Sequence, residues 1–98
     1  MNIGDIFTFT KNFFDNESDG LLKYYPEISP DKKYEIQNFI NLEGFNGATK
    51  ISCVDDGSVF SIYELNRLPE SQRPENLWWC FISDQFSNEY EVLDGNTN

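Results

Sequence analysis

The pattern D-x-E-x-D-G, formed by Asp15, Glu17, Asp19 and Gly20, places carboxylates at alternate positions just before a glycine. A calcium-binding loop begins in this way, because calcium prefers oxygen ligands and the glycine permits a sharp turn. Such a loop must close on a bidentate glutamate, and Pro26 stands at that position. We therefore expect a solvated acidic loop tip here, and no bound metal or cofactor.

The remaining chemistry-bearing residues indicate a protein that is not an enzyme. The chain of 98 residues has seventeen Asp and Glu, seven Lys and Arg and no histidine, which gives a net charge of −10. Without histidine, Ser-His-Asp and Cys-His nucleophile systems and His-ligated metals are excluded. Paired carboxylates can perform acid/base chemistry, but the candidates here stand in loop-like or solvent-facing positions. The scarcity of basic residues also disfavours direct binding to nucleic acid.

Two adjacent tryptophans mark a candidate binding surface. Trp78 and Trp79 lie in the apolar segment 77–83, L-W-W-C-F-I-S. Neighbouring side chains of a strand face opposite ways, so Trp79 and Phe81 would share one face and Trp78 the other. An isolated hairpin cannot bury both faces. Either the rest of the fold sandwiches this segment, or one face contacts a partner or a second copy of the chain.

Negative charge gathers in the last quarter of the chain and in two loops. From position 75 to the end there are five acidic residues and no basic one. Acidic residues promote solubility, but the charge exceeds the magnitude of about 2–8 that a small domain needs for it. The alternative is a negative surface that steers the chain onto a basic partner. On that alternative, the predicted partner-binding residues are Trp79, Phe81, Asp84, Glu89, Glu91, Asp94, Asp15, Glu17, Asp19, Tyr24 and Tyr25.

The elements that must position these residues are mainly strands. Alternating apolar residues predict strands at 3–10, 33–41, 48–55 and 58–63, with a long loop at 11–32 and a shorter one at 42–47. Asp56-Gly57 is a strong hairpin signal. The broken alternation at Phe39-Ile40 indicates a bulge. A helical or 3₁₀ turn is predicted at 64–68, before Pro69, and the segments 77–83 and 89–93 predict a C-terminal hairpin.

A single domain over residues 1–98 suits this length. Cys53 and Cys80 are predicted to be buried free thiols in a cytosolic chain, and no apolar run is long enough for a transmembrane helix. The predicted core includes Phe7, Phe9, Ile36, Ile51, Cys53, Val59 and Ile62.

The order of elements resembles the SH3-like small β-barrel over about residues 3–68. The resemblance depends on G-D-I-F-T-F at 4–9, K-Y-E-I at 33–36 and K-I-S-C-V-D-D-G-S-V-F at 50–60. It implies an RT-type loop at 11–32 and a distal turn at Asp56-Gly57, with 69–98 as an extension that carries the added hairpin. The motifs for binding proline-rich ligands are missing, so the chain is more similar to bacterial and phage SH3-like barrels.

In general character the chain resembles phage-encoded counter-defence proteins, such as anti-CRISPR and anti-restriction inhibitors. That resemblance implies a cytoplasmic inhibitor in a bacterial host, whose partner is a protein with a basic nucleic-acid-binding surface. The inhibitor would occupy that surface, with carboxylates in place of phosphates and aromatics as anchors. Two alternatives remain at this point: an immunity protein that blocks a toxin nuclease, and a structural SH3-like adaptor domain.

Overall fold

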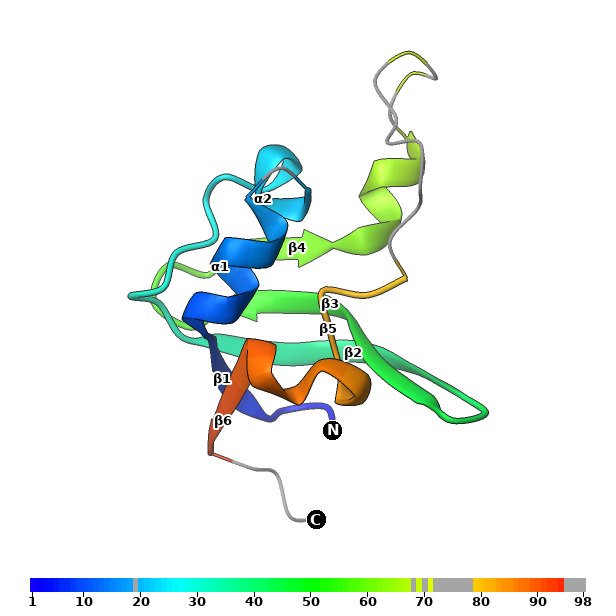
Figure 1. Ribbon diagram of the computed structural model, residues 1–98. Coiled ribbons are helices and arrows are strands. Elements are labelled where there is room, and N and C mark those ends of the chain that lie inside the picture. Colours follow the sequence, from blue (N-terminus) through cyan, green and yellow to red (C-terminus); the bar gives the residue numbers. More distant parts are fainter. Residues whose placement is uncertain (19, 68, 70, 72–78, 95–98) are drawn as a thin grey trace.

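The computed structural model describes residues 1–18, 20–67, 69, 71 and 79–94. Within these ranges six strands form an antiparallel sheet in the order β4-β3-β2-β1-β6, and β5 pairs with β3 beside β4 (Figure 1). The prediction of a mainly β fold is therefore confirmed. The strands are β1 (Ile6–Phe9), β2 (Tyr34–Leu42), β3 (Phe45–Cys53), β4 (Val59–Ser61), β5 (Ile82–Ser83) and β6 (Tyr90–Asp94).

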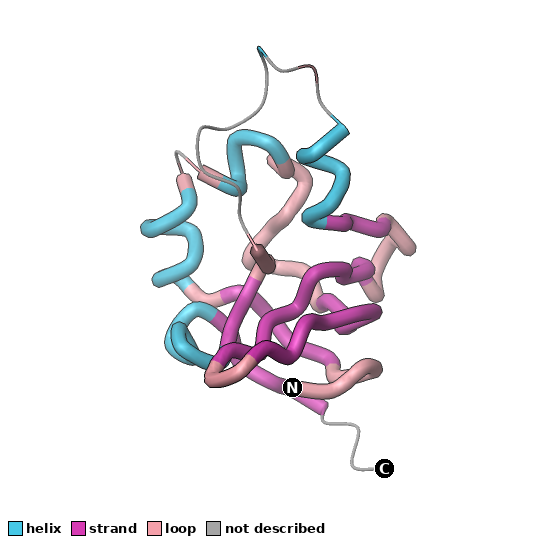
Figure 2. Tube along the Cα trace, turned by 90° about the vertical axis from the view of Figure 1, so that its right-hand side faces the viewer, coloured by secondary structure: helices cyan, strands magenta, loops and turns pink. Residues whose placement is uncertain are grey.

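Short helices accompany the sheet, with α1 and the 3₁₀ helix η3 together on one of its faces (Figures 1 and 2). The predicted helical turn near 64–68 is present as the 3₁₀ helix η1. None of the helices in the described part of the chain is long and apolar enough to cross a membrane. The helices are α1 (Lys11–Glu17), α2 (Leu21–Tyr24), η1 (Ile62–Arg67) and η3 (Asp84–Glu89).

The hairpin of β2 and β3 provides the two longest strands of the sheet. The predicted loop at 42–47 is wrong, because Leu42 pairs directly with Phe45 and only two residues make the turn. Gly44 stands in that turn with φ +73°, a conformation that glycine adopts without the steric cost of a Cβ atom. The predicted bulge is present but lies earlier in the strand, where the register shifts between Ile36 and Phe39.

The β3–β4 hairpin confirms the turn predicted at Asp56-Gly57, although the turn is longer than two residues. The Cys53 N–H donates to the Ser58 carbonyl at 2.7 Å, and the Gly57 N–H donates to the Cys53 carbonyl at 2.9 Å. Residues 54–57 therefore form the connection. Gly57 has φ +77°, which is the reason a glycine is required here.

Aromatic rings dominate the core between the sheet and the helices. The rings of Phe9 and Phe13 lie 4.2 Å apart, and Tyr34 packs against Phe9 at 5.2 Å. Val59 was predicted in the core, but it is 52% exposed, and its neighbour Phe60 is buried instead. The two side chains face opposite sides of β4, and the larger aromatic residue takes the inner position. The other predicted core residues are buried: Phe7, Phe9, Ile36, Ile51, Cys53 and Ile62.

The segment 11–32 contains two helices, so the prediction of a continuous loop is wrong. The Asn, Asp and Glu residues of α1 resemble loop composition, and a helix this short has little stability of its own. Tertiary contacts decide its structure. Phe13 is buried in the aromatic core, and the Thr10 N–H at the start of α1 donates to the Glu89 carbonyl at 3.0 Å.

The predicted C-terminal hairpin is also wrong within the described residues. Ile82 pairs with Ala48 of β3, whereas β6 pairs with β1, Phe9 opposite Tyr90. Between them η3 carries the chain from one edge of the sheet to the other (Figure 1). The physical reason is that the outer edge of β1 offers unpaired backbone groups along its length, and β6 satisfies them. The part of the prediction on residues 77 and 78 lies outside the described residues.

Candidate functional site

An open pocket of about 420 Å³ lies between α1, the start of α2, β3 and the segment that leads into η3. Several aromatic residues line it, and one of them, Phe81, is buried. Trp79 is 67% exposed and Phe86 is 55% exposed, so both present apolar surface to solvent beside the pocket. The pocket thus joins the core to a surface with two large exposed aromatic side chains.

Two carboxylates stand on the α1 side of this pocket. Glu89, at the end of η3, is only 9% exposed, and its Oε2 accepts a hydrogen bond from Asn16 Nδ2 at 3.0 Å. Glu17, at the end of α1, accepts from the Leu21 N–H at 3.2 Å and so joins α1 to α2. Hydrogen bonds from neutral amide groups therefore fix the position of both carboxylates.

The start of η3 is held to the tip of the β2–β3 hairpin by two hydrogen bonds. Asp84 Oδ1 accepts from the Asn46 N–H at 3.1 Å, and Gln85 Nε2 donates to the Gly44 carbonyl at 3.2 Å. At the far end of η3, the Thr10 hydroxyl and Asn12 Nδ2 both donate to the Asn88 carbonyl. These contacts fix both ends of η3, which is kinked at Phe86 and ends at Glu89, so the pocket wall is preorganised.

Cys80 lines the pocket beside Gly47 of β3. A Cβ atom on Gly47 would lie 2.7 Å from Cys80 Sγ, so glycine is needed for this close approach. Burial raises the pKa of the Cys80 thiol to about 11, and the nearby carboxylates of Glu89, Asp84 and Glu17 add to the effect. The thiol is therefore neutral at physiological pH and unsuited to nucleophilic chemistry. Both cysteines are free. Cys53 is buried as predicted, whereas Cys80, also predicted to be buried, is half-buried.

No Lys or Arg lines the pocket among the described residues. Two ion pairs of the described ranges lie elsewhere: Lys11–Asp15 at 2.7 Å on the exposed face of α1, and Lys32–Asp56 at 3.0 Å beside the β3–β4 turn. The pocket therefore combines apolar walls with a negatively charged side.

The structure brings together four of the residues predicted to bind a partner. The pocket is lined by Trp79, Phe81, Glu17 and Glu89. Asp84 does not line it but comes directly after Ser83, which does. Of these, Phe81 is buried and offers little surface. The grouping could not be read from the chain, since α1 and η3 are far apart in sequence.

The other predicted residues lie elsewhere. Asp15 pairs with Lys11, and Tyr25 is buried with its hydroxyl donating to the Ser61 carbonyl at 2.6 Å. Tyr24 is half-buried against the core. Glu91 and Asp94 are exposed on the edge strand β6, and Asp19 lies outside the described residues.

Sequence reasoning did not assign the other pocket residues to a binding site; they are Asn16, Leu21, Phe45, Cys80, Ile82, Ser83 and Phe86. Phe86 is an isolated aromatic in a polar segment, D-Q-F-S-N-E, which is a signal of an exposed apolar contact. Asn16 and Phe45 carry no comparable signal. Their place depends on the pairing of β2 with β3 and on the packing of α1 against η3.

The comparisons with known proteins give one clear match. No curated protein and no solved structure matches the chain, so the SH3-like resemblance finds no support there. The family model of the PinA peptidase inhibitor matches residues 2–97. Proteins of an inhibitor family act on a protein partner, in agreement with the sequence-based prediction of a binding protein. Since the match covers almost the whole sequence, the chain belongs to the PinA peptidase inhibitor family.

Proposed function

We propose that this protein inhibits a peptidase by binding to it, and that the pocket beside Trp79 and Phe86 is the centre of the contact. The family supports the peptidase as the class of target. The observation that carries the proposed surface is the exposure of these two aromatic side chains next to a preorganised pocket. Large aromatic residues are enriched among those that dominate the binding energy of protein interfaces.

The negative charge favours a peptidase that presents a basic surface. A net charge of −10 accelerates association with such a surface, and this acceleration weakens as salt screens the charges. In its narrower form, the proposal is that this basic surface of the peptidase is one that binds nucleic acid. The family match gives no support to a nuclease or restriction target, and therefore none to the anti-CRISPR, anti-restriction and immunity hypotheses. We place the complex in the cytoplasm of a bacterial host, where free cysteines persist.

The test is inhibition of peptide hydrolysis in a panel of purified bacterial cytoplasmic peptidases, with wild type, Trp79→Ala, Phe86→Ala and Val54→Ala. Val54 is a matched control, because it is 54% exposed but lies in the β3–β4 turn, away from the pocket. For an inhibited peptidase, we expect Trp79→Ala to weaken binding about 30-fold, the effect of losing a hot-spot residue. Val54→Ala should inhibit like the wild type.

The kinetics separate the aromatic and electrostatic contributions. Trp79→Ala should act mainly by faster dissociation, and added salt mainly by slower association. Inhibition by Trp79→Ala and Phe86→Ala at wild-type concentrations would remove the pocket from the proposed contact. A panel in which no peptidase is inhibited would contradict the proposed target class.

A further inference from the structure

The pocket has a chemical character more specific than that of an apolar groove. It is lined by the aromatic residues Phe45, Trp79 and Phe86 and, on its α1 side, by the acidic residues Glu17 and Glu89. We infer that its occupant is an arginine side chain of the inhibited peptidase. This inference depends on the proposed function, because it names the group by which the partner enters the pocket.

Glu89 carries the first step of the argument. Its side chain is about nine-tenths buried, and within the described residues its carboxylate accepts from the neutral amide of Asn16. A carboxylate removed from water in this way is normally compensated by a positive charge. Among the described residues no Lys or Arg lines the pocket to provide one. A cation from outside is therefore the complementary ligand.

The aromatic wall selects among cations. A guanidinium group is planar, stacks on aromatic faces and donates five hydrogen bonds in a fixed geometry. A lysine ammonium is more strongly hydrated and has no flat face, so it would leave the rings of Trp79 and Phe86 without a matching surface. An apolar side chain would bury Glu89 further without compensating its charge. An acidic group is excluded by repulsion from Glu17 and Glu89.

The experiment titrates the free protein with N-acetyl-arginine amide and follows the Trp79 indole and Asn16 amide signals by NMR. N-acetyl-citrulline amide is the control ligand, since it has almost the same shape but no charge. Glu89→Gln is the decisive variant: the glutamine oxygen can still accept from Asn16, so only the charge is removed. Glu91→Gln removes the same charge from an exposed position on β6 and is its matched control.

We expect saturable shifts of these signals with the arginine amide, with a Kd above about 1 mM because a single side chain provides little binding energy. The affinity should fall at least tenfold in Glu89→Gln and stay within twofold of wild type in Glu91→Gln, changes of about 1.4 and 0.4 kcal/mol. Equal binding of the citrulline compound, an unchanged affinity in Glu89→Gln, or no saturable shift at these signals would each overturn the inference.

The peptidase assay distinguishes failure of this inference from failure of the proposed function. If Trp79→Ala loses inhibition while Glu89→Gln inhibits like the wild type, the pocket is the contact but no arginine enters it. If neither substitution changes inhibition, the contact itself is misplaced. Loss of inhibition in both, with Glu91→Gln unaffected, supports the arginine as the group that binds.

Discussion

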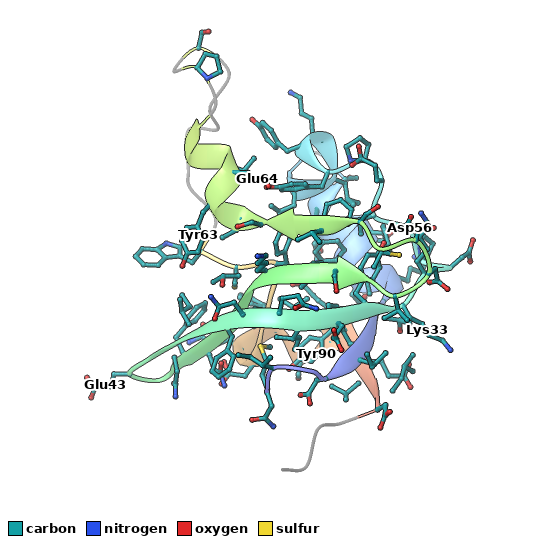
Figure 3. The ribbon with its side chains drawn as sticks, turned by 180° about the vertical axis from the view of Figure 1, so that it is seen from behind. Lys33, Glu43, Asp56, Tyr63, Glu64 and Tyr90 are labelled. Atoms are coloured by element: carbon teal, nitrogen blue, oxygen red, sulfur yellow. The ribbon has the colours of Figure 1, made fainter. Side chains whose placement is uncertain are left out.

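The β3–β4 turn and the pocket use their acidic side chains in opposite ways. In the turn, Asp56 accepts from the Ser58 N–H at 2.9 Å and pairs with Lys32 at 3.0 Å, while Asp55 accepts from the Lys33 N–H at 2.9 Å. Both carboxylates there accept hydrogen bonds from backbone N–H groups and so stabilise the conformation of the turn. Asp56 and Lys33 lie together at this end of the sheet, far from Glu43 at the tip of the β2–β3 hairpin (Figure 3).

In the pocket, by contrast, Glu89 accepts from a neutral amide, and no Lys or Arg of the described chain lines the wall beside it. The charge of −10 therefore does not have one role throughout the molecule. The part on Asp55 and Asp56 stabilises the β3–β4 turn through hydrogen bonds, whether or not a partner is bound. Another part, the carboxylate of Glu89, lies beside exposed aromatic side chains, where a positively charged partner would complement it.

Gly47→Ala should produce the largest loss of stability, because it would disturb the wall of the pocket directly. The new Cβ would lie 2.7 Å from Cys80 Sγ and 2.8 Å from Cys80 Cβ, both too short for real contacts. We expect a loss of about 1–3 kcal/mol in the free energy of unfolding, measured by urea denaturation. Cys80→Gly in the same chain should recover most of it. A Gly47→Ala protein as stable as wild type would mean that the pocket wall is not fixed.

The sequence predicted the turn region well because its signals are local. Asp56-Gly57 indicates a hairpin through residues adjacent in the chain, and the alternation of β3 identifies Ile51 and Cys53 as core residues. The prediction placed Val59 in the core where the structure has Phe60, an error of one residue in β4. This strand has three residues, too few for the alternation to show which side chains face the core.

The pocket could not be predicted as a whole, because its walls are brought together by long-range packing. Helix α1 exists through contacts with η3, and the two are separated by most of the chain. Trp79 was identified from its residue type and Glu89 from the run of acids, but nothing local indicated that Asn16 would join them. Local patterns predict elements, whereas contacts between distant segments form a binding site.

Asp56→Asn and Glu89→Gln should differ in their effect on the melting temperature, which tests the contrast between turn and pocket most sharply. The Ser58 N–H and Lys32 hold the pKa of Asp56 well below the ordinary aspartate range, so the charged form stabilises the fold. Asp56→Asn should therefore lower the melting temperature at pH 7. Glu89→Gln should not lower it, because the substitution removes a buried charge and keeps an acceptor for Asn16.

The pH dependence of stability follows from the lowered pKa of Asp56. A carboxyl group with a lowered folded pKa stabilises the protein above its unfolded pKa, and this contribution is lost as the pH falls below the ordinary aspartate range. The melting temperatures of wild type and Asp56→Asn should therefore converge on acidification. A difference that stayed constant between pH 7 and pH 2 would show that Asp56 acts through shape and not through charge.

Cys80 should give the smallest effect, on the alkaline side of the pH range. Its pKa is raised from 9.0 to about 11, so the folded protein keeps a proton that the unfolded chain loses between these values. Stability from this group is complete below pH 9 and declines as the pH rises to about 11. Calorimetry across this range should show a steeper decline in wild type than in Cys80→Ala.

The difference between the two proteins isolates Cys80 from the tyrosines, which titrate in the same direction. Burial raises the pKa of Tyr25 to about 12 and also raises the pKa of Tyr34 and Tyr90, but these groups are common to both proteins. At pH 8, in a Cys53→Ala background, the Cys80 thiol should react with an alkylating reagent at least tenfold more slowly than in the denatured chain. Equal rates would show that the folded structure does not shield the Cys80 thiol from solvent, and would contradict the burial that raises its pKa.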